Sequence, residues 1–466
     1  MARAFLTHPI TDDSALGGSV IERSLRFNND DNTRLTRTIG STSNRRTFTY
    51  SFWIKRTMKS AEQYVLYNGH ATGVPYFDTR FEANDHQLQF IDYTGSHAMQ
   101  LRTERRFRDV GSWSHLVFQK DDGVYKIYHN GTEITDFDTN TQSSGTNVFN
   151  NASGNTTIGL ENLASAGDPF KGYITEAVLI DGQALAPTSF GEFNSDSPTI
   201  WQPKNVSGLT FGNNGFYLDF EDSSNLGNDA SGGTDFTSNN LAATDQSTDT
   251  CTNNFCTLNP LSFTEGTLSE GNLEIDQNGS AGRFCASTFQ VTKGKWYYEA
   301  KILNYGSDPR PSLGVGRNEE TYTGNAHQGA SSIVYGLENE AVIKGNTSVF
   351  DHNSSPSSGD IYGVAFDLDN LKIYFHKNGT YFNSGDPANG TGNVTTLVSG
   401  TDYSPITGAL NTNSNSVRNN DWQFNFGSPM YSISSGNSDA NGHGNFEYTV
   451  PSGFFSLCSK NLAEFG

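Results

Sequence analysis

Hydrophobic and polar residues alternate in the same order in two separate stretches of this chain. The first stretch runs from Trp113 to Phe118, through an acidic turn at Asp121-Asp122-Gly123 and a second strand at Tyr125–Tyr128, to Asn130-Gly131. The second runs from Ile361 to Phe366, through Asp367–Asn370 and Lys372–Phe375, to Asn378-Gly379. Alternating β-branched and aromatic residues between such turns are typical of β-hairpins, because an Asn-Gly turn needs positive φ values. The pattern predicts two antiparallel β-sandwiches in series, with positive φ at least at Gly131 and Gly379.

Composition supports an all-β fold. Gly, Asn, Ser and Thr are abundant, which is typical of strands and turns. A chain of 466 residues is too long for one core and suits two domains. We therefore predict a polar N-terminal arm at residues 1–20, a first sandwich at 21–195, a connector rich in Asp, Asn and Gly at 196–260, and a second sandwich at 261–466.

The motifs of the first half form an ordered set. They are Phe27-Asn28-Asn29-Asp30-Asp31, Phe48–Lys55, Trp113–Phe118, Tyr128-His129-Asn130-Gly131, Ile158-Gly159 and Gly172–Leu185. This set resembles the laminin-G-like or concanavalin-A-like jelly roll over roughly residues 20–195. The resemblance implies a fold more firmly than it implies a ligand.

A second set of motifs covers the other half. It consists of Gly294–Ile302, Leu313–Gly316, Tyr335-Gly336, Gly359–Asp369, Lys372–Phe375, Lys377–Gly379, Phe424–Gly427 and Pro451–Phe454. This run resembles a SPRY domain, itself a concanavalin-A-like sandwich, over roughly residues 263–457. SPRY domains contact partners through variable loops, so the resemblance names no ligand.

Charge and cysteine content narrow the classes of partner. The net charge of −20 does not favour nucleic acid, because phosphate binding depends on Lys and Arg. No apolar run has the length of a signal peptide or of a membrane span, so we expect no export by the usual signal and no membrane insertion. Cys251, Cys256, Cys285 and Cys458 are too few for a disulfide framework and are predicted to be free thiols.

Sequence motifs for catalysis are missing. The chain has no Gly-x-Ser-x-Gly elbow before a helix and no His-Glu-x-x-His motif. His115 and His129 alternate along hairpin strands and are interpreted as residues of a sheet face. The pair Glu319-Glu320 could imitate a glycosidase site, but no acidic motif lies on an alternating strand. We therefore expect no enzyme activity.

Aromatic residues at loop ends are the better candidates for function. Exposed rings stack on sugar rings, and neighbouring Asn, Asp and Gln bind sugar hydroxyls. The candidate ligand-binding residues are Tyr76, Tyr93, Tyr322 and Tyr403. Trp113 is a weaker candidate, because Trp113, Trp296 and Trp422 open or occupy strands and are expected in the core.

An acidic cluster in the connector suggests a calcium site. It consists of Asp219, Glu221 and Asp222, with Asn225 and Asp229 nearby. Carboxylate and amide oxygens are the ligands that Ca²⁺ prefers. The cluster lacks the spacing of an EF-hand, so a solvated turn remains the alternative, and no other cofactor is expected.

The tandem arrangement suggests a setting for the protein. A laminin-G-like domain, this connector and a SPRY domain together resemble structural proteins of tailed bacteriophages, notably marine, cyanophage-like ones. The resemblance implies a virion protein, assembled in the host cytoplasm and exposed on the particle as a tail fibre or a capsid or tail decoration. Its partners would be other virion proteins and a host-surface glycan, with homo-oligomerisation through sandwich faces or the arm. A purely structural adaptor and a glycan-degrading depolymerase are the alternatives.

Overall fold

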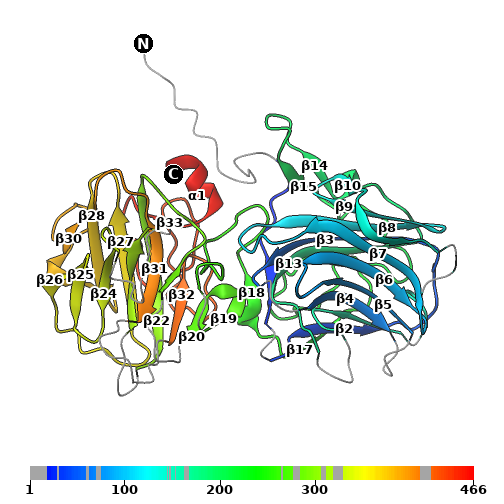
Figure 1. Ribbon diagram of the computed structural model, residues 1–466, viewed down its shortest axis with the longest axis horizontal. Coiled ribbons are helices and arrows are strands. Elements are labelled where there is room, and N and C mark those ends of the chain that lie inside the picture. The colour runs from blue at the N-terminus through cyan, green and yellow to red at the C-terminus, as the bar shows by residue number, and fades with distance from the viewer. Residues whose placement is uncertain are drawn as a thin grey trace, which may run out of the picture.

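Two β-sandwiches lie side by side in the computed structural model of the chain (Figure 1). The structure describes residues 18–28, 31–58, 62–69, 75–143, 145, 148–152, 154–161, 167–263, 266–276, 284–305, 311–317, 329–409 and 421–466. Strands make up nearly all the regular structure of these residues, as predicted. The predicted arm falls largely at residues 1–17, which lie outside the described residues.

The first sandwich is built from two eight-stranded sheets. One sheet has the order β10 (Thr132–Ile134), β9 (Val124–His129), β8 (Ser114–Asp121), β3 (Thr47–Arg56), β13 (Gly172–Asp181), β1 (Ser24–Phe27) and β18 (Gln246–Ser247), with β16 (Phe216–Leu218) also paired to β13. The other has the order β11 (Phe137–Thr141), β7 (His97–Arg106), β6 (Gln87–Tyr93), β5 (Tyr76–Phe81), β4 (Gln63–Gly69), β12 (Asn155–Ile158), β2 (Arg34–Thr38) and β17 (Thr237–Asn239). We call the second of these the tyrosine sheet.

Alternation along β3 explains how the core of the first sandwich forms. Phe48, Tyr50, Phe52 and Ile54 point into the core, where Phe48 contacts Phe77 of the tyrosine sheet with ring centroids 5.8 Å apart. Successive side chains of a strand point to opposite faces, so Trp53 lies on the outer face. There its ring stacks on His115 at 4.7 Å.

The segment predicted as a connector is built into the first sandwich over much of its length. It supplies β16, β17 and β18 to the two sheets, and β15 (Trp201–Pro203) pairs with β14 (Gly191–Phe193). This hairpin places Trp201 over the outer face of β8, where its indole Nε1 donates to Nδ1 of the buried His115 at 3.0 Å. His115 and His129 thus lie on sheet faces, as interpreted from the sequence. Turns rich in Asn and Gly separate these short strands, which is why the segment resembles a loop in sequence.

The second sandwich pairs a nine-stranded sheet with a six-stranded sheet. The nine-stranded sheet has the order β19 (Thr267–Ser269), β20 (Glu274–Asp276), β32 (Asp421–Asn425), β22 (Lys295–Asn304), β27 (Ile361–Asp367), β28 (Lys372–Lys377) and β29 (Thr380–Tyr381), with β30 (Thr395–Thr396) on β28 and β33 (Phe455–Ser456) on β22. The six-stranded sheet has the order β21 (Phe284–Ala286), β31 (Ser404–Ala409), β23 (Pro311–Gly316), β24 (Ile333–Gly336), β25 (Ala341–Lys344) and β26 (Thr347–Asp351).

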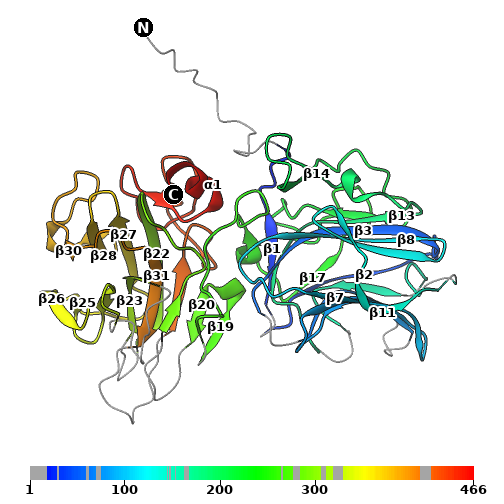
Figure 2. The same cartoon turned by 45° about the horizontal axis from the view of Figure 1, so that its top comes forward.

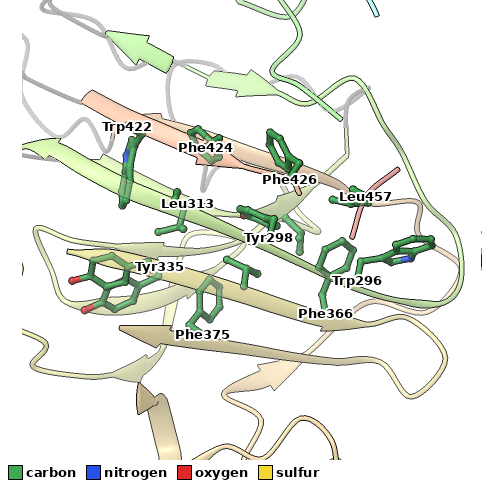
Figure 3. Close-up of a cluster of buried hydrophobic side chains, with 14 of the residues drawn as sticks. Trp296, Tyr298, Leu313, Tyr335, Phe366, Phe375, Trp422, Phe424, Phe426 and Leu457 are labelled. Atoms are coloured by element: carbon green, nitrogen blue, oxygen red, sulfur yellow. The ribbon is translucent and has the colours of Figure 1, made fainter. Parts of the chain in front are cut away.

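Aromatic side chains fill the space between these two sheets (Figure 3). Trp296 and Trp422 are fully buried there, as expected from the sequence. Tyr298 packs against Phe426 with ring centroids 5.5 Å apart, and its hydroxyl donates to the carbonyl of Gly314 at 2.7 Å. The hydrogen bond satisfies a polar group that would otherwise be costly to bury.

Both Asn-Gly turns have the backbone that the sequence predicts. The φ angles are 47° at Asn130 and 76° at Gly131, and 47° at Asn378 and 81° at Gly379. Each asparagine side chain accepts from a backbone N–H at the start of a neighbouring strand, Asn130 from His115 at 2.8 Å and Asn378 from Ile361 at 2.9 Å. The same turn therefore closes the same hairpin edge in both sandwiches.

Buried polar contacts join the two sandwiches near β1, β19 and β20. Figure 2 shows the course of the backbone at this junction. Arg26 of β1 pairs with Glu270 at 3.1 Å and with Asp245 at 3.0 Å. Lys55 of β3, which pairs with the buried Asp249 at 2.7 Å, also donates to the carbonyl of Phe255 at 2.9 Å, and Phe255 pairs with Cys458 of the second sandwich. Tyr173 donates to the carbonyl of Gly271 at 3.1 Å. The junction is therefore a packed interface.

Helical structure is limited to short pieces. They are the 3₁₀ turns η1 (Pro187–Ser189), η2 (Ala243–Asp245), η3 (Glu270–Asn272) and η4 (Phe382–Ser384), and the helix α1 (Ser459–Phe465) near the junction (Figure 1). Among the described residues, no helix has the length and hydrophobicity needed to cross a bilayer. All four cysteines are free thiols, and three of them are buried.

Candidate functional site

The outer face of the tyrosine sheet brings together two of the predicted ligand-binding residues. Tyr76 of β5 and Tyr93 of β6 are direct cross-strand neighbours. Their rings stack with centroids 5.0 Å apart and an interplanar angle of 22°. Both side chains are half-buried, so part of each ring remains accessible.

Tyr67 of β4 extends this pair into a row of three rings, which we call the tyrosine ladder. Its ring stacks on Tyr76 with centroids 5.7 Å apart. Gly69, two residues further along β4, makes room for it, because a Cβ there would lie 2.6 Å from the Tyr67 hydroxyl. The sequence analysis missed Tyr67 as a site residue. The alternation of side chains along the strand, which puts Tyr67 on the outward face, was the signal that could have identified it.

A buried carboxylate lies on the same face as the ladder. Asp78 is the cross-strand neighbour of Tyr67 on one side and of Ile91 on the other. The side chain is completely buried, and neither carboxylate oxygen has a hydrogen-bond partner among the described residues. Unsatisfied buried polar atoms are rare in folded proteins and mark positions where a ligand or water is expected to bind.

Arg80 provides the nearest positive charge. Its Nη1 lies 3.7 Å from Oδ2 of Asp78, and its Nε lies 2.9 Å from Oε1 of Glu62. Burial nevertheless raises the pKa of Asp78 to about 7, with Arg80 lowering it and the nearby Glu62 and Glu161 raising it. The carboxyl group therefore changes its protonation state near neutral pH.

This arrangement is suited to a polyhydroxylated ring. Flat aromatic faces stack on the apolar face of a sugar, and a carboxylate accepts hydrogen bonds from hydroxyl groups. Gln89 and Gln100 lie on the same face of the next strands, joined by a hydrogen bond of 3.1 Å from Gln100 Nε2 to Gln89 Oε1. The ladder thus supplies aromatic contact surface, and its neighbours supply donors and acceptors.

Tyr403 and Trp113, the other candidates among the described residues, do not join the ladder. Tyr403 is fully buried in the second sandwich, and its hydroxyl accepts from the backbone N–H of Val398 at 2.9 Å. The prediction that Tyr403 contacts a ligand is wrong, because its ring packs in the core. Tyr322 lies outside the described residues. Trp113 is half-buried, and its Nε1 donates to Asp249 at 2.9 Å.

The acidic cluster predicted as a calcium site is not organised around a cation. Among the described residues, no group of three or more His, Cys, Asp or Glu side chains could hold a metal ion. Asp222 accepts from the backbone and the hydroxyl of Ser224, and Asp219 accepts from the backbone of Glu221. Asp229 pairs with the buried Arg37 at 3.3 Å. These contacts are those of a turn that caps its own backbone, the alternative considered from the sequence.

Comparison with protein families identifies the two domains. Residues 27–188 match the Concanavalin A-like lectin/glucanases superfamily in its laminin G form, and residues 295–395 match the SPRY domain. The chain therefore contains an N-terminal concanavalin-A-like domain and a C-terminal SPRY domain, as the sequence motifs indicated. No curated protein matches the chain.

Solved structures show only partial likeness. The human HERC1 SPRY domain is 14% identical, with 36% of this chain and 96% of that chain covered and a TM-score of 0.29. Domain 4 of the arabinanase AbnA from Geobacillus stearothermophilus, solved with arabinotriose, is 22% identical (33% and 68% covered, TM-score 0.27). The heptameric SAP-like pentraxin from Limulus polyphemus is 15% identical (41% and 98% covered, TM-score 0.30).

Proposed function

We propose that this chain is a non-enzymatic binding protein whose first sandwich binds a saccharide at the tyrosine ladder. The observation that carries the proposal is the stacked row of Tyr67, Tyr76 and Tyr93 beside the buried Asp78, whose carboxylate oxygens have no hydrogen-bond partner among the described residues. Stacking on aromatic rings selects a flat ligand, and an acceptor-only carboxylate selects hydroxyl donors. The match of residues 27–188 to a superfamily that includes lectins supports the same ligand class.

In this proposal the side chains have separate roles. Tyr76 and Tyr93 keep accessible ring surface and would contact the sugar, whereas Tyr67 is buried and supports Tyr76 from behind. Asp78 would accept hydroxyl groups, with Arg80 balancing its charge at 3.7 Å. A binding role needs no nucleophile or general acid, in agreement with the motifs missing from the sequence.

A glycan array probed with the full chain tests this proposal. We expect binding to a restricted set of glycans, and at least a tenfold loss of affinity for Tyr93→Ala but a much smaller loss for Tyr93→Phe, which keeps the ring. The matched control is Tyr128→Ala, a half-buried tyrosine on the other sheet. Equal loss in the control, or no loss in Tyr93→Ala, would contradict the proposed site. Release of reducing sugars from a bound glycan would contradict a non-enzymatic role.

The proposal extends to the setting of the protein. We place it on a bacteriophage virion, as a tail fibre or a capsid or tail decoration that attaches to host-surface glycans or to other virion proteins. Support for this placement comes from the resemblance of the two domains and their connector to phage structural proteins. Mass spectrometry of purified particles should detect the chain in stoichiometric amounts. Its absence from particles would remove the virion assignment and leave the saccharide site untouched.

A further inference from the structure

A cavity of about 470 Å³ opens near the C-terminal end of β5, whereas the tyrosine ladder lies at the N-terminal end of this strand. The cavity is formed where β3 and β7 end and β8 begins, and its lining includes Arg56, Arg105, Arg106, Arg108, Trp113 and His129. Phe81, the last residue of β5, also lines it, five residues along the strand from Tyr76. At roughly 3.3 Å per residue, the cavity and the ladder are about 17 Å apart along β5. They are separate sites.

The charge of this cavity is opposite to that of the whole chain. The net charge is −20, yet four arginines line the cavity and Asp109 is the one acidic residue among its lining residues. Asp109 is engaged in its own turn, where it accepts from the backbone of Gly111 at 2.9 Å. Arg106 pairs with Asp85 at 2.6 Å, but Arg108 has no ion-pair partner among the described residues. Positive charge therefore remains uncompensated at the cavity.

Arg56 is the buried member of this group. Arg56 is only 3% exposed, and its guanidinium lies over the ring of Phe81, 4.2 Å from the ring centroid. Nη1 donates to the carbonyl of Phe107 at 2.6 Å and Nε donates to Gln63 at 3.3 Å, whereas Nη2 has no acceptor among the described residues. No carboxylate accepts from this guanidinium in the described part of the chain. A buried cation with a free N–H is a site for an anion, since charged groups are buried with a partner.

The remaining side chains define the environment of the guanidinium groups. Arg105 donates to Nδ1 of His129 at 2.7 Å, and Nε2 of His129 lies 3.3 Å from the hydroxyl of Ser114. Burial and the charge of Arg105 lower the pKa of His129 to about 4, so the imidazole is neutral and acts as an acceptor that orients Arg105. Trp113 is held by its bond to Asp249, with part of its indole exposed at the cavity.

We propose that this cavity binds the carboxylate or sulfate group of an acidic saccharide. Arg105 and Arg108 contact the anionic group at the mouth, Arg56 donates from the wall, and Trp113 stacks on the sugar ring. Planar guanidinium groups bind carboxylate and sulfate oxygens through paired hydrogen bonds, which lysine cannot reproduce. The saccharide part rests on the proposed function, whereas the selection of an anion rests on the arginines alone.

Isothermal titration of the full chain tests the proposal with four probes: an oligogalacturonate, a sulfated galactan oligosaccharide, a neutral galactan oligosaccharide and inorganic sulfate. We expect the carboxylated or the sulfated probe to bind at least tenfold more tightly than the neutral probe, and more weakly as salt is raised. Arg108→Gln should weaken that binding about tenfold. Arg108→Lys should weaken it less, because lysine keeps the positive charge but not the paired hydrogen bonds. Arg46→Gln, an exposed arginine of the same sandwich that pairs with Asp122, is the matched control and should change affinity less than twofold.

The outcomes separate this site from the ladder. Loss of acidic-probe binding in Arg108→Gln, with neutral-glycan binding intact, supports the cavity site. Loss of neutral-glycan binding in Tyr93→Ala, with acidic-probe binding intact, supports the ladder. Equal affinity for acidic and neutral probes, or an Arg108→Gln variant like wild type, would overturn the proposal. Inorganic sulfate that binds as tightly as the best saccharide would overturn its saccharide part. Arg56→Lys should weaken acidic-probe binding without changing neutral-glycan binding, and circular dichroism should show that the variant is folded. Unchanged acidic-probe binding in the folded variant would overturn the role of Arg56.

Discussion

We expect Asp78 to make saccharide binding at the proposed site depend on pH. Its carboxyl group is buried, lies 3.7 Å from Arg80 and has a pKa raised to about 7 by desolvation. A sugar that donates hydroxyls to Asp78 stabilises the ionised form and lowers this pKa. We therefore expect saccharide affinity to increase between pH 5 and pH 8. Asp78→Asn should abolish most of this dependence, and affinity that falls over the range would contradict the role of Asp78.

The same ionisation affects the stability of the unliganded protein. Because the folded-state pKa lies above the ordinary value of 3.8, the contribution of Asp78 to stability is fully present below about pH 4 and is lost as pH rises through about 7. At about 1.4 kcal/mol per pKa unit, Asp78→Asn should stabilise the protein at pH 8 by up to about 4 kcal/mol. Urea unfolding at pH 5 and pH 8 measures this effect. Asp122→Asn, an exposed carboxylate, is the control and should show little change.

Residue types alone could identify only part of the site. Tyr76 and Tyr93 were predicted individually, and the register of β5 and β6 then made them neighbours. Tyr403 has the same residue type at a loop end, but burial of its ring depends on tertiary packing that no local pattern records. Asp78 and Arg80 had no distinguishing signal in the sequence, because their importance comes from burial on the outer face of the tyrosine sheet.

The two Asn-Gly turns were predictable from the sequence, because the backbone conformation that they need depends on neighbouring residues alone. Gly131→Val places a β-branched residue at φ 76°, where its Cβ would lie 2.3 Å from a ring carbon of Trp201. Gly379→Val meets the same strain at φ 81°, with Tyr448 at 2.7 Å. Strain of this kind costs about 1–3 kcal/mol, and the Trp201 contact should make Gly131→Val the more destabilising variant.

Chemical denaturation of the two glycine variants measures this difference. Gly208→Val is the control, because a Cβ at Gly208 meets no atom within 4 Å. A control as destabilised as Gly131→Val would show that the cost arises from lost glycine flexibility in general. The order of effects is thus a test of the turn geometry.

Short strands were harder to predict than turns. β16, β17 and β18 are two or three residues long, and their pairing partners β13, β2 and β1 lie far away in sequence. No hydrophobic period can develop over so few residues. The segment at 196–260 therefore reads as a connector in sequence, although much of it forms sheet edges and covers the first sandwich.

We expect the junction to couple the unfolding of the two sandwiches. Lys55 and Asp249 form an ion pair of 2.7 Å with side-chain exposures of 0% and 1%. Removing one partner of a buried pair leaves the other charge uncompensated, which costs about 3–5 kcal/mol. Lys55→Met should therefore destabilise the chain by this amount. Because it also removes the hydrogen bond from Lys55 to the carbonyl of Phe255, a residue that pairs with Cys458 of the second sandwich, it should separate the unfolding of the two sandwiches into two calorimetric transitions. A single, unshifted transition would show that the pair does not couple them.

A crystal structure of the full chain with a bound neutral oligosaccharide tests the central claim most directly. The account predicts a sugar ring in contact with the accessible ring surfaces of Tyr76 and Tyr93, with at least one hydroxyl within hydrogen-bonding distance of a carboxylate oxygen of Asp78. An oligosaccharide bound on the second sandwich, or elsewhere on the first with the ladder unoccupied, would contradict it.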